Sequence, residues 1–375
     1  MRFSSLVLSV AVVASFSLAA TSIPANAYVP RDESYNSSNP STWTNRQLAA
    51  QTIFTCSSAP SLGYHKRDVA DGLGGIALVG FGASPNLKSQ VEKLRRLSPN
   101  GVGLVIASDE ECGWVQRLRR AIYTLPSATT MGAWPASKIR ATAKAYGLRM
   151  KALGVDIAFS PVADLNVPGF FIAENRRGFS ADPETAGVKA TAWALGLADA
   201  GVIPTVKHWP GHGSSGDTHA RPSTLASIDK LQTRDLVPFK YAFEHGVNVA
   251  MVGHLLVPGL TEDSTPTSRS PKALALLREQ IGEDGIIITD SLSMGGATKG
   301  LHKDIAEAAI RSLEAGVDIA LVCTGPKNLL TRVTEAVNSG RLTREALLKK
   351  VRRILKLKKK LGLVTLPPAL STSRN

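Results

Sequence analysis

The chain is 375 residues long and strongly basic, with a formal net charge of +14 at neutral pH. The sequence carries no DNA- or RNA-binding motif, so we exclude a nucleic-acid partner despite this charge. A basic protein outside the cell would suit anionic partners such as cell-wall polymers. Solubility alone would also account for the charge, which therefore does not decide between the two.

Residues 1–27 have the pattern of an export signal. Arg2 gives a positive start, residues 6–20 are mostly apolar with interspersed serines, and Ala25-Asn26-Ala27 is a small-x-small cleavage site. An uncleaved anchor is the alternative, but the apolar run is short for a membrane span, and we predict no span in the mature chain. We expect a secreted or cell-wall-associated protein beginning at Tyr28, with a disordered or wrapped leader over 28–45.

From about residue 46 the chain alternates short apolar runs with helical patterns. Many runs are apolar throughout, as in strands buried on both faces. The predicted strands are 51–56, 75–79, 103–107, 155–161, 203–208, 249–254, 285–290 and 319–323, and the predicted helices are 87–97, 137–153, 183–200, 231–245, 272–281, 305–316 and 327–339. This order predicts an α/β fold, a single (β/α)8 barrel of the TIM type over 46–362, with a C-terminal tail over 363–375. A doubly wound open sheet is the alternative.

A last helix is predicted in the most basic stretch of the chain. One apolar stripe at helical spacing is formed by Leu347, Val351, Ile354, Leu355 and Leu361. We expect this helix to pack on the barrel with its basic face in water, rather than to lie on a membrane surface.

The three cysteines allow one disulfide and one free thiol. Cys56 and Cys112 each follow a predicted strand, which would put both at the same end of the sheet, and export would permit a bridge between them. We predict a Cys56–Cys112 disulfide and a buried free thiol at Cys323.

Ionisable side chains stand where five of the predicted strands end. These positions are 109–111, Asp164, Lys207 with His208, His254 and Asp290. In a barrel the carboxyl ends of the strands meet at one rim, where catalytic residues gather. Asp290 could instead cap a following helix, but five ionisable strand ends on one rim favour an active site.

The most specific motif is the run Lys-His-Trp-Pro-Gly-His-Gly over 207–213, with Asp217-Thr218-His219 after it. A loop rich in glycine and serine thus carries a carboxylate two residues before an imidazole, and such a pair can hold and transfer a proton. His208, His212 and His219 could instead bind a metal, but their spacing matches no standard zinc signature. We predict neither a metal nor another cofactor.

These strings resemble glycoside hydrolase family 3, in particular its bacterial β-N-acetylglucosaminidase branch. The resemblance rests on the loop motif and on residues 109–117, 160–164, 177–183 and 288–294, and it extends from about 46 to 362. It implies a retaining exo-β-N-acetylglucosaminidase that cleaves terminal N-acetylglucosamine from cell-wall or chitin-type oligosaccharides. The alternatives are a family 3 glycosidase or phosphorylase of other specificity, a metal-dependent hydrolase, and a sugar-binding barrel without activity.

The resemblance also implies roles for individual residues. Asp290 would be the nucleophile that forms a covalent glycosyl-enzyme, His219 the acid/base, and Asp217 the carboxylate that orients His219. The residues implied to bind the hydroxyls of the terminal sugar are Asp109, Arg117, Arg177, Lys207 and His208.

Two positions depart from the family pattern. Cys112-Gly113-Trp114 stands where the family usually has Gly-Gly-Arg, and Gly178 stands where it usually has Ser. Trp114 could stack on a sugar face or pack beneath the predicted disulfide.

Overall fold

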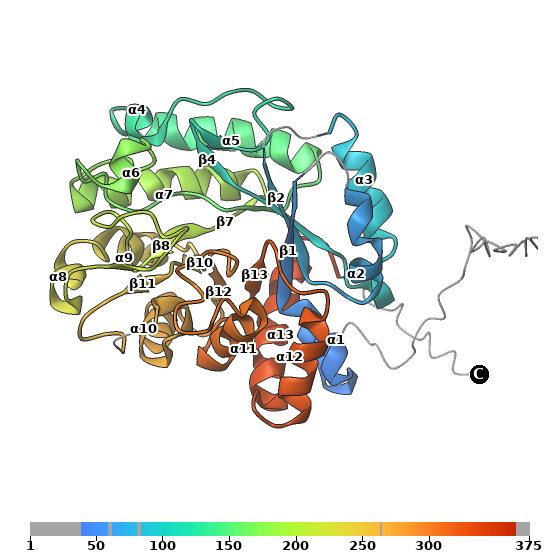
Figure 1. Ribbon diagram of the computed structural model, residues 1–375. Helices are drawn as coiled ribbons and strands as arrows, with labels where there is room; N and C mark the ends of the chain where they lie inside the picture. Colours follow the sequence, from blue (N-terminus) through green and yellow to red (C-terminus); the bar gives the residue numbers. More distant parts are fainter. Residues whose placement is uncertain (1–38, 59–61, 81–83, 263–264, 365–375) are drawn as a thin grey trace, which may run out of the picture.

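The fold is built on parallel strands that follow the chain around a barrel. A computed structural model describes residues 39–58, 62–80, 84–262 and 265–364 (Figure 1). The predicted export signal, residues 28–38 of the leader and residues 365–375 of the tail lie outside these ranges. The barrel strands are β1 (Ile53–Ser58), β2 (Gly75–Val79), β3 (Val105–Ser108), β6 (Ile157–Ala158), β7 (Ile203–Pro204) continued by β8 (Val206–Trp209), β10 (Val249–Val252), β12 (Ile286–Thr289) and β13 (Ala320–Val322).

The strands pair in two sheets, in the orders β13-β1-β2-β3-β6-β7 and β12-β10-β8. Two seams connect these sheets. At one, Val162 forms a parallel bridge with Lys207, next to the join of β7 and β8; at the other, Ile288 forms a parallel bridge with Ile319, between β12 and β13. The strands therefore succeed one another in chain order around a TIM-type α/β barrel, as the sequence predicted.

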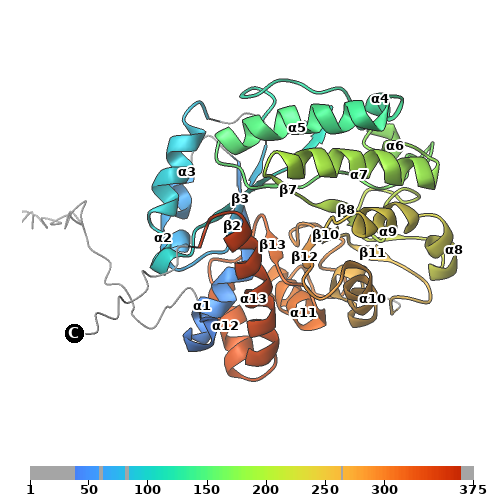
Figure 2. The same ribbon diagram turned by 180° about the vertical axis from the view of Figure 1, so that it is seen from behind.

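Helices lie around the strands, as Figure 1 and the reverse view in Figure 2 show. Their bounds are α1 (Asn45–Gln51), α2 (Lys66–Ala70), α3 (Leu87–Arg95), α4 (Ala128–Gly132), α5 (Ala136–Ala152), α6 (Phe171–Glu174), α7 (Pro183–Asp199), α8 (Ile228–Thr233), α9 (Val237–Glu244), α10 (Pro271–Ile281), α11 (Ile305–Ala315), α12 (Leu329–Asn338) and α13 (Arg344–Lys360). Of the helices in the described ranges, none is both long enough and apolar enough to cross a membrane.

The prediction of one continuous helix over 231–245 is wrong, because the structure has two helices there, α8 and α9. Arg234 leaves the helical conformation with φ −134° and ψ −77°. Pro238 then stands in the first turn of α9. Proline is tolerated there because the first backbone N–H groups of a helix have no partner within it.

Helices α5 and α7 pack against each other over the strands (Figure 1). Gly196 permits this close approach, because a Cβ atom at Gly196 would lie 2.3 Å from the carbonyl oxygen of Arg140. Asp182 caps the start of α7 by accepting the backbone N–H of Thr185 at 2.8 Å.

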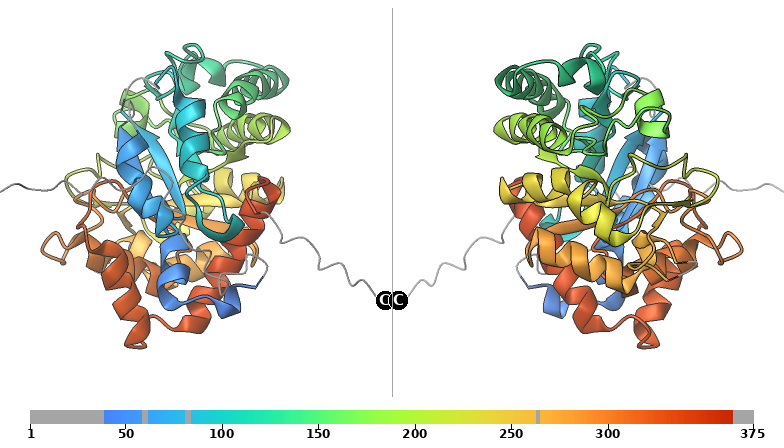
Figure 3. Two further views of the ribbon diagram at one scale, coloured as in Figure 1. Left: turned by 90° about the vertical axis from the view of Figure 1, so that its right-hand side faces the viewer. Right: turned by 90° about the vertical axis from the view of Figure 1, so that its left-hand side faces the viewer.

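Helix α13 covers the amino-terminal end of the barrel, and Figure 3 shows it from two further sides. The predicted stripe residues Leu347, Val351, Ile354 and Leu355 are buried, and Ile354 packs with apolar side chains of the barrel strands. We expected the basic face to lie in water, and this is wrong for one residue. Lys358 is buried and donates to Gln51 Oε1 at 2.7 Å. That hydrogen bond compensates part of the cost of removing the ammonium from water.

The predicted disulfide is wrong. Cys56 is bonded to Cys323, with their Cα atoms 4.3 Å apart, and Cys112 is the buried free cysteine. The reason is strand order: β1 pairs with β13 up to Thr55 and Val322, so Cys56 lies beside Cys323, the residue directly after β13. Cys112 lies beyond β3, two strands away from β1. Trp114 consequently does not pack beneath a disulfide.

Removing this disulfide with Cys56→Ser and Cys323→Ser is expected to lower the free energy of unfolding by about 2–4 kcal/mol, because the bond closes a long loop in the unfolded chain. Urea denaturation measures this change. In the denatured, unreduced wild type, a thiol reagent should find one thiol, and Cys112→Ser should remove it. Three thiols before reduction would contradict the Cys56–Cys323 bond.

Candidate active site

A cluster of carboxylates and cations occupies the rim at the carboxyl ends of the strands. Lys207 Nζ lies 2.7 Å from Asp109 Oδ1 and 2.6 Å from Glu111 Oε1. Arg177 donates twice to Glu111, from Nε at 2.6 Å and from Nη2 at 2.8 Å. Arg117 Nη2 lies 3.4 Å from Asp109 Oδ2. Asp109 and Glu111 thus connect the three predicted sugar-binding cations.

The groups of this cluster stabilise one another in their charged forms. Burial raises the pKa of Glu111, but the Arg177 guanidinium and the Lys207 ammonium lower it by more than burial raises it. The pKa therefore lies well below its usual range. Burial lowers the pKa of Lys207, yet Asp109 and Glu111 raise it above its usual value. At neutral pH the cluster therefore presents ionised donors and acceptors, which suit a polyhydroxyl ligand.

Asp164 holds the two histidines of the loop motif. Its Oδ1 accepts the backbone N–H groups of His208 at 3.0 Å and His212 at 2.6 Å, and its Oδ2 accepts His208 Nδ1 at 2.6 Å. Burial raises the pKa of Asp164, but His208 lowers it below the usual value. Since the carboxylate only accepts, His208 carries a proton on Nδ1, and its Nε2 lies 3.4 Å from Arg177 Nη2.

His212 fixes the start of the loop that follows β8. Its Nδ1 lies 2.7 Å from Ser215 Oγ, and its Nε2 lies 3.2 Å from Thr218 Oγ1. Burial lowers the pKa of His212 to about 4, so the ring is neutral at neutral pH. These contacts connect the start of the loop to Thr218, the residue between Asp217 and His219.

Asp217 and His219 form a hydrogen-bonded pair on the exposed side of this loop. Asp217 Oδ1 accepts the backbone N–H of His219 at 2.9 Å and its Nδ1 at 2.5 Å. The side chains are 49% and 67% exposed, respectively. Partial burial raises the pKa of Asp217, but the hydrogen bonds from His219 lower it below the usual value. Because Asp217 occupies Nδ1, the His219 Nε2 is the ring atom that can exchange a proton with a ligand.

The loop is fastened to the segment that follows β12. Gly295 donates its backbone N–H to the carbonyl oxygen of His219 at 2.6 Å, and Gly296 donates to that of Thr218 at 3.2 Å. Asp290 is the residue directly after β12. The pair and Asp290 therefore lie at the same rim of the barrel.

Asp290 is held by β10 and by the residue that follows it. Its backbone N–H donates to Val252 at 2.9 Å, and its Oδ1 accepts the backbone N–H of Ser291 at 2.7 Å. Burial raises the pKa of Asp290, but His208, His254 and Lys207 lower it below the usual value. The carboxylate is therefore ionised at neutral pH.

His254 supports the backbone beside Asp290. It is fully buried, with Nε2 3.0 Å from the carbonyl oxygen of Ser291 and Nδ1 2.8 Å from Ser268 Oγ. Since a carbonyl oxygen only accepts, the proton is on Nε2, and Nδ1 accepts from the Ser268 hydroxyl. His254 thus acts on the position of residues 290–291 through the main chain.

Sequence reasoning noted Glu111 and Asp164 at strand ends but gave neither a role. Glu111 stands two residues after Asp109, and alternate residues of an extended segment face the same side, which was the available signal. No comparable signal marked Phe171, whose ring centroid lies 6.4 Å from that of His219 and 5.9 Å from that of His212.

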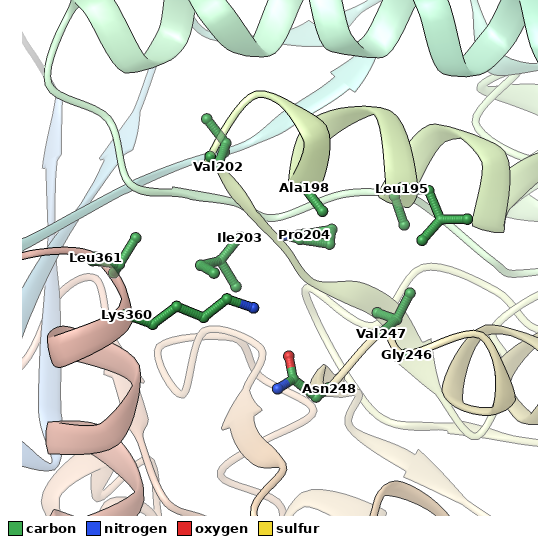
Figure 4. Close-up of a pocket in the computed structure, with 12 residues that line it drawn as sticks. Leu195, Ala198, Val202, Ile203, Pro204, Gly246, Val247, Asn248, Lys360 and Leu361 are labelled. Carbon is green, nitrogen blue, oxygen red and sulfur yellow. The ribbon is translucent and has the colours of Figure 1, made fainter.

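The rings of His208 and His212 lie edge to face with centroids 5.7 Å apart, but the three histidines of the motif do not form a metal site. The ring of each has its own side-chain partner, Asp164 for His208, Ser215 and Thr218 for His212, and Asp217 for His219. In the described ranges no group of three or more His, Cys, Asp or Glu side chains could hold a metal ion. A separate hollow lies at the opposite end of the barrel, where β7 and β10 begin and α13 ends (Figure 4). Lys360 and Asn248 line it, but none of the site residues does.

A barrel rim that combines ionised sugar-binding groups, a carboxylate at the end of β12 and an Asp–His pair is typical of a glycoside hydrolase. The chain belongs to glycosyl hydrolase family 3, because the profile "Glycosyl hydrolase family 3 N terminal domain" matches residues 70–357.

Comparisons with individual proteins agree with this family. The chain is 39% identical over 265 residues to beta-hexosaminidase LpqI of Mycobacterium tuberculosis, and the alignment covers 68% of each chain. It is 35% identical over 253 residues to a beta-hexosaminidase of Methylococcus capsulatus, covering 65% of this chain and 73% of the other.

Solved structures of the same family have the same fold. The structure of M. tuberculosis LpqI has a TM-score of 0.78 and 33% identity, and the match covers 86% of this chain and 96% of that one. A family 3 β-N-acetylglucosaminidase from a Paenibacillus species has a TM-score of 0.79 and 29% identity, covering 87% of this chain and 65% of that one.

Proposed function

We propose that the protein is an exported, retaining exo-β-N-acetylglucosaminidase that releases terminal β-linked N-acetylglucosamine from cell-wall or chitin-type oligosaccharides. The observation that carries this proposal is the Asp217–His219 pair on a loop hydrogen-bonded to the segment just after Asp290. Relatives named beta-hexosaminidase support the hexosaminide as substrate. The sequence pattern of residues 1–27 and the disulfide support export.

In the first step, the Asp290 carboxylate attacks the anomeric carbon while the bond to the leaving oxygen breaks. His219 enters this step as the imidazolium, which the Asp217 carboxylate stabilises; its Nε2 gives its proton to that oxygen, and the ring becomes neutral. The product is a glycosyl ester of Asp290. The lowered pKa of Asp290 supports this role, because a nucleophile must be ionised.

In the second step, water attacks the anomeric carbon from the side the leaving group vacated. His219 Nε2 takes the proton of the water, and the bond to Asp290 breaks, which regenerates the carboxylate and gives the β-anomer. The cluster of Asp109, Arg177 and Lys207 would hold the hydroxyl groups of the terminal sugar through both steps. Arg117 and His208 belong to the same binding set.

The test is hydrolysis of 4-nitrophenyl N-acetyl-β-glucosaminide against the corresponding β-glucoside, with and without phosphate. We expect the hexosaminide to be cleaved faster and proton NMR to detect the β-anomer first. A sugar phosphate product would favour a phosphorylase, and a first-formed α-anomer would exclude retention. Loss of activity with a chelator and recovery with zinc would favour a metal-dependent hydrolase.

The anchoring of the loop leads to a separate prediction for Gly295→Ala. A Cβ atom at Gly295 would lie 2.1 Å from the carbonyl oxygen of Ala220, so the loop must move. We expect kcat/KM to fall by about 10- to 100-fold, since small misplacement of a catalytic group is costly. The matched control is Gly216→Ala in the same loop, where a Cβ atom meets nothing within 4 Å. Equal activity of the two variants would contradict the anchoring.

A further inference from the structure

A short hairpin carries an exposed tryptophan from the sugar-binding cluster toward solvent. Strands β4 (Glu110–Cys112) and β5 (Val115–Gln116) are antiparallel, and Gly113 and Trp114 join them. Trp114 is 69% exposed, which is unusual for so large an apolar side chain. The mechanism described above does not use it.

The position of the hairpin tip is fixed by packing on its inner side. Gly113 has φ +60°, and a Cβ atom there would lie 2.9 Å from Ser127 Cα, so the turn lies directly against the N-cap residue of α4. At the base, Gln116 Nε2 donates to the Tyr146 hydroxyl at 2.7 Å, and Gln116 Oε1 accepts the N–H of Leu125 at 3.0 Å. The exposed ring therefore projects from a well-supported turn.

The indole ring is also held from one side. The guanidinium carbon of Arg119 lies 5.4 Å from the ring centroid, within the range of a cation–π contact. Trp114 nevertheless keeps most of its surface in solvent, so a ligand can contact the ring. A ring that is already oriented loses little freedom when a ligand stacks on it.

The hairpin begins inside the sugar-binding cluster. Glu111, three residues before Trp114, binds both Arg177 and Lys207. At 3.8 Å between consecutive Cα atoms, the Cα of Trp114 lies within about 11 Å of that of Glu111. A second sugar, attached to the one held by the cluster, extends over a comparable length.

We propose that Trp114 forms a leaving-group subsite, in which the indole stacks on the sugar next to the N-acetylglucosamine that is released. This inference rests on the proposed function. The apolar face of a pyranose matches an aromatic face, whereas its hydroxyl groups stay in water at an exposed site. The subsite makes the enzyme prefer oligosaccharides to simple glycosides, and it uses the position where this chain departs from the Gly-Gly-Arg pattern of its family.

The experiment compares kcat/KM for two substrates with the same released sugar. N,N′-diacetylchitobiose has a second sugar as its leaving group, whereas N-acetyl-β-glucosaminyl fluoride has an atom that cannot stack. We expect Trp114→Ala to lower the ratio of disaccharide to fluoride about tenfold, mainly through KM for the disaccharide. Trp114→Phe, which keeps an aromatic ring, should restore most of the ratio.

The control is Leu148→Ala, which removes another exposed apolar side chain, on α5. Its ratio should equal that of the wild type, and thermal unfolding should show that all variants are folded. An unchanged ratio in Trp114→Ala, or an equal loss on both substrates, overturns the subsite while leaving the proposed function intact. A wild type that cleaves neither substrate overturns the proposed function, and the subsite with it.

Discussion

Replacing Asp290 with alanine is expected to lower kcat on an aryl N-acetyl-β-glucosaminide by at least about 10⁴-fold, the size of loss typical when a covalent nucleophile is removed. The expectation follows from position and charge. Asp290 directly follows β12, accepts the N–H of Ser291 and is held in the ionised form by His208, His254 and Lys207. Without its carboxylate, no glycosyl ester can form.

Two measurements check this role directly. A 5-fluoro N-acetylglucosaminyl fluoride should form an ester that accumulates, and mass spectrometry should find the sugar on the peptide that contains Asp290. Azide added to Asp290→Ala should yield the α-glycosyl azide, because azide attacks from the side where the Asp290 carboxylate is missing. Asp284→Asn, which alters an exposed carboxylate at the opposite end of the barrel, is the control. A label on another carboxylate would overturn the assignment.

Replacing His219 with alanine should separate substrates by the acidity of their leaving groups. For chitobiose, whose leaving oxygen needs a proton, we expect kcat/KM to fall by about 10²- to 10⁴-fold. For a 2,4-dinitrophenyl glycoside, whose leaving group needs no proton, the loss in kcat/KM should be small. The physical reason is that Asp217 occupies His219 Nδ1 and leaves Nε2 for proton transfer.

His245→Ala provides the matched control, since His245 is an exposed histidine at the end of α9, away from the site. Asp217→Asn should show a smaller loss than His219→Ala, because it removes the charge that stabilises the imidazolium but keeps the ring. Azide should accelerate His219→Ala on the activated substrate and give the β-glycosyl azide. Equal losses on both substrates would exclude His219 as the acid.

The positions of the strands along the chain were predictable because the barrel strands are buried on both faces. Runs such as 286–289 contain only residues that favour strands and no polar alternation, and the observed bounds of β2, β10 and β12 fall within the predicted ranges. The hairpin of β4 and β5 could not be predicted in this way, because strands of two or three residues carry no periodicity. Its conformation depends on tertiary contacts such as that of Gly113 with Ser127.

The position of a candidate site residue was predictable where a single ionisable residue follows a strand. The contacts of a residue with partners from distant parts of the chain were not predictable. Lys207 and Asp290 follow apolar runs, so their position marked them. Asp164 binds two backbone N–H groups and one imidazole that come from a distant part of the chain. Only the fold brings these groups together, which is why the sequence indicated Asp164 without its function.

The cysteine prediction was wrong although the correct pairing followed from the predicted fold. Cys56 and Cys112 were matched because each follows a strand, but every strand of a barrel ends at the same rim. Adjacency around the barrel is the stronger criterion, since disulfide partners need Cα atoms within about 7 Å. In a closed barrel the first and last strands are neighbours, which favours Cys56 with Cys323.

That neighbour relation also governs how the polypeptide must be assembled. The pairing of β1 with β13 joins Ile53 to Ala320, so the first strand lacks one partner until nearly all of the chain has been synthesised. During that time it exposes an unsatisfied edge, which invites association with other unfolded chains. A nascent chain of this protein is therefore expected to need protection until its last strand has emerged.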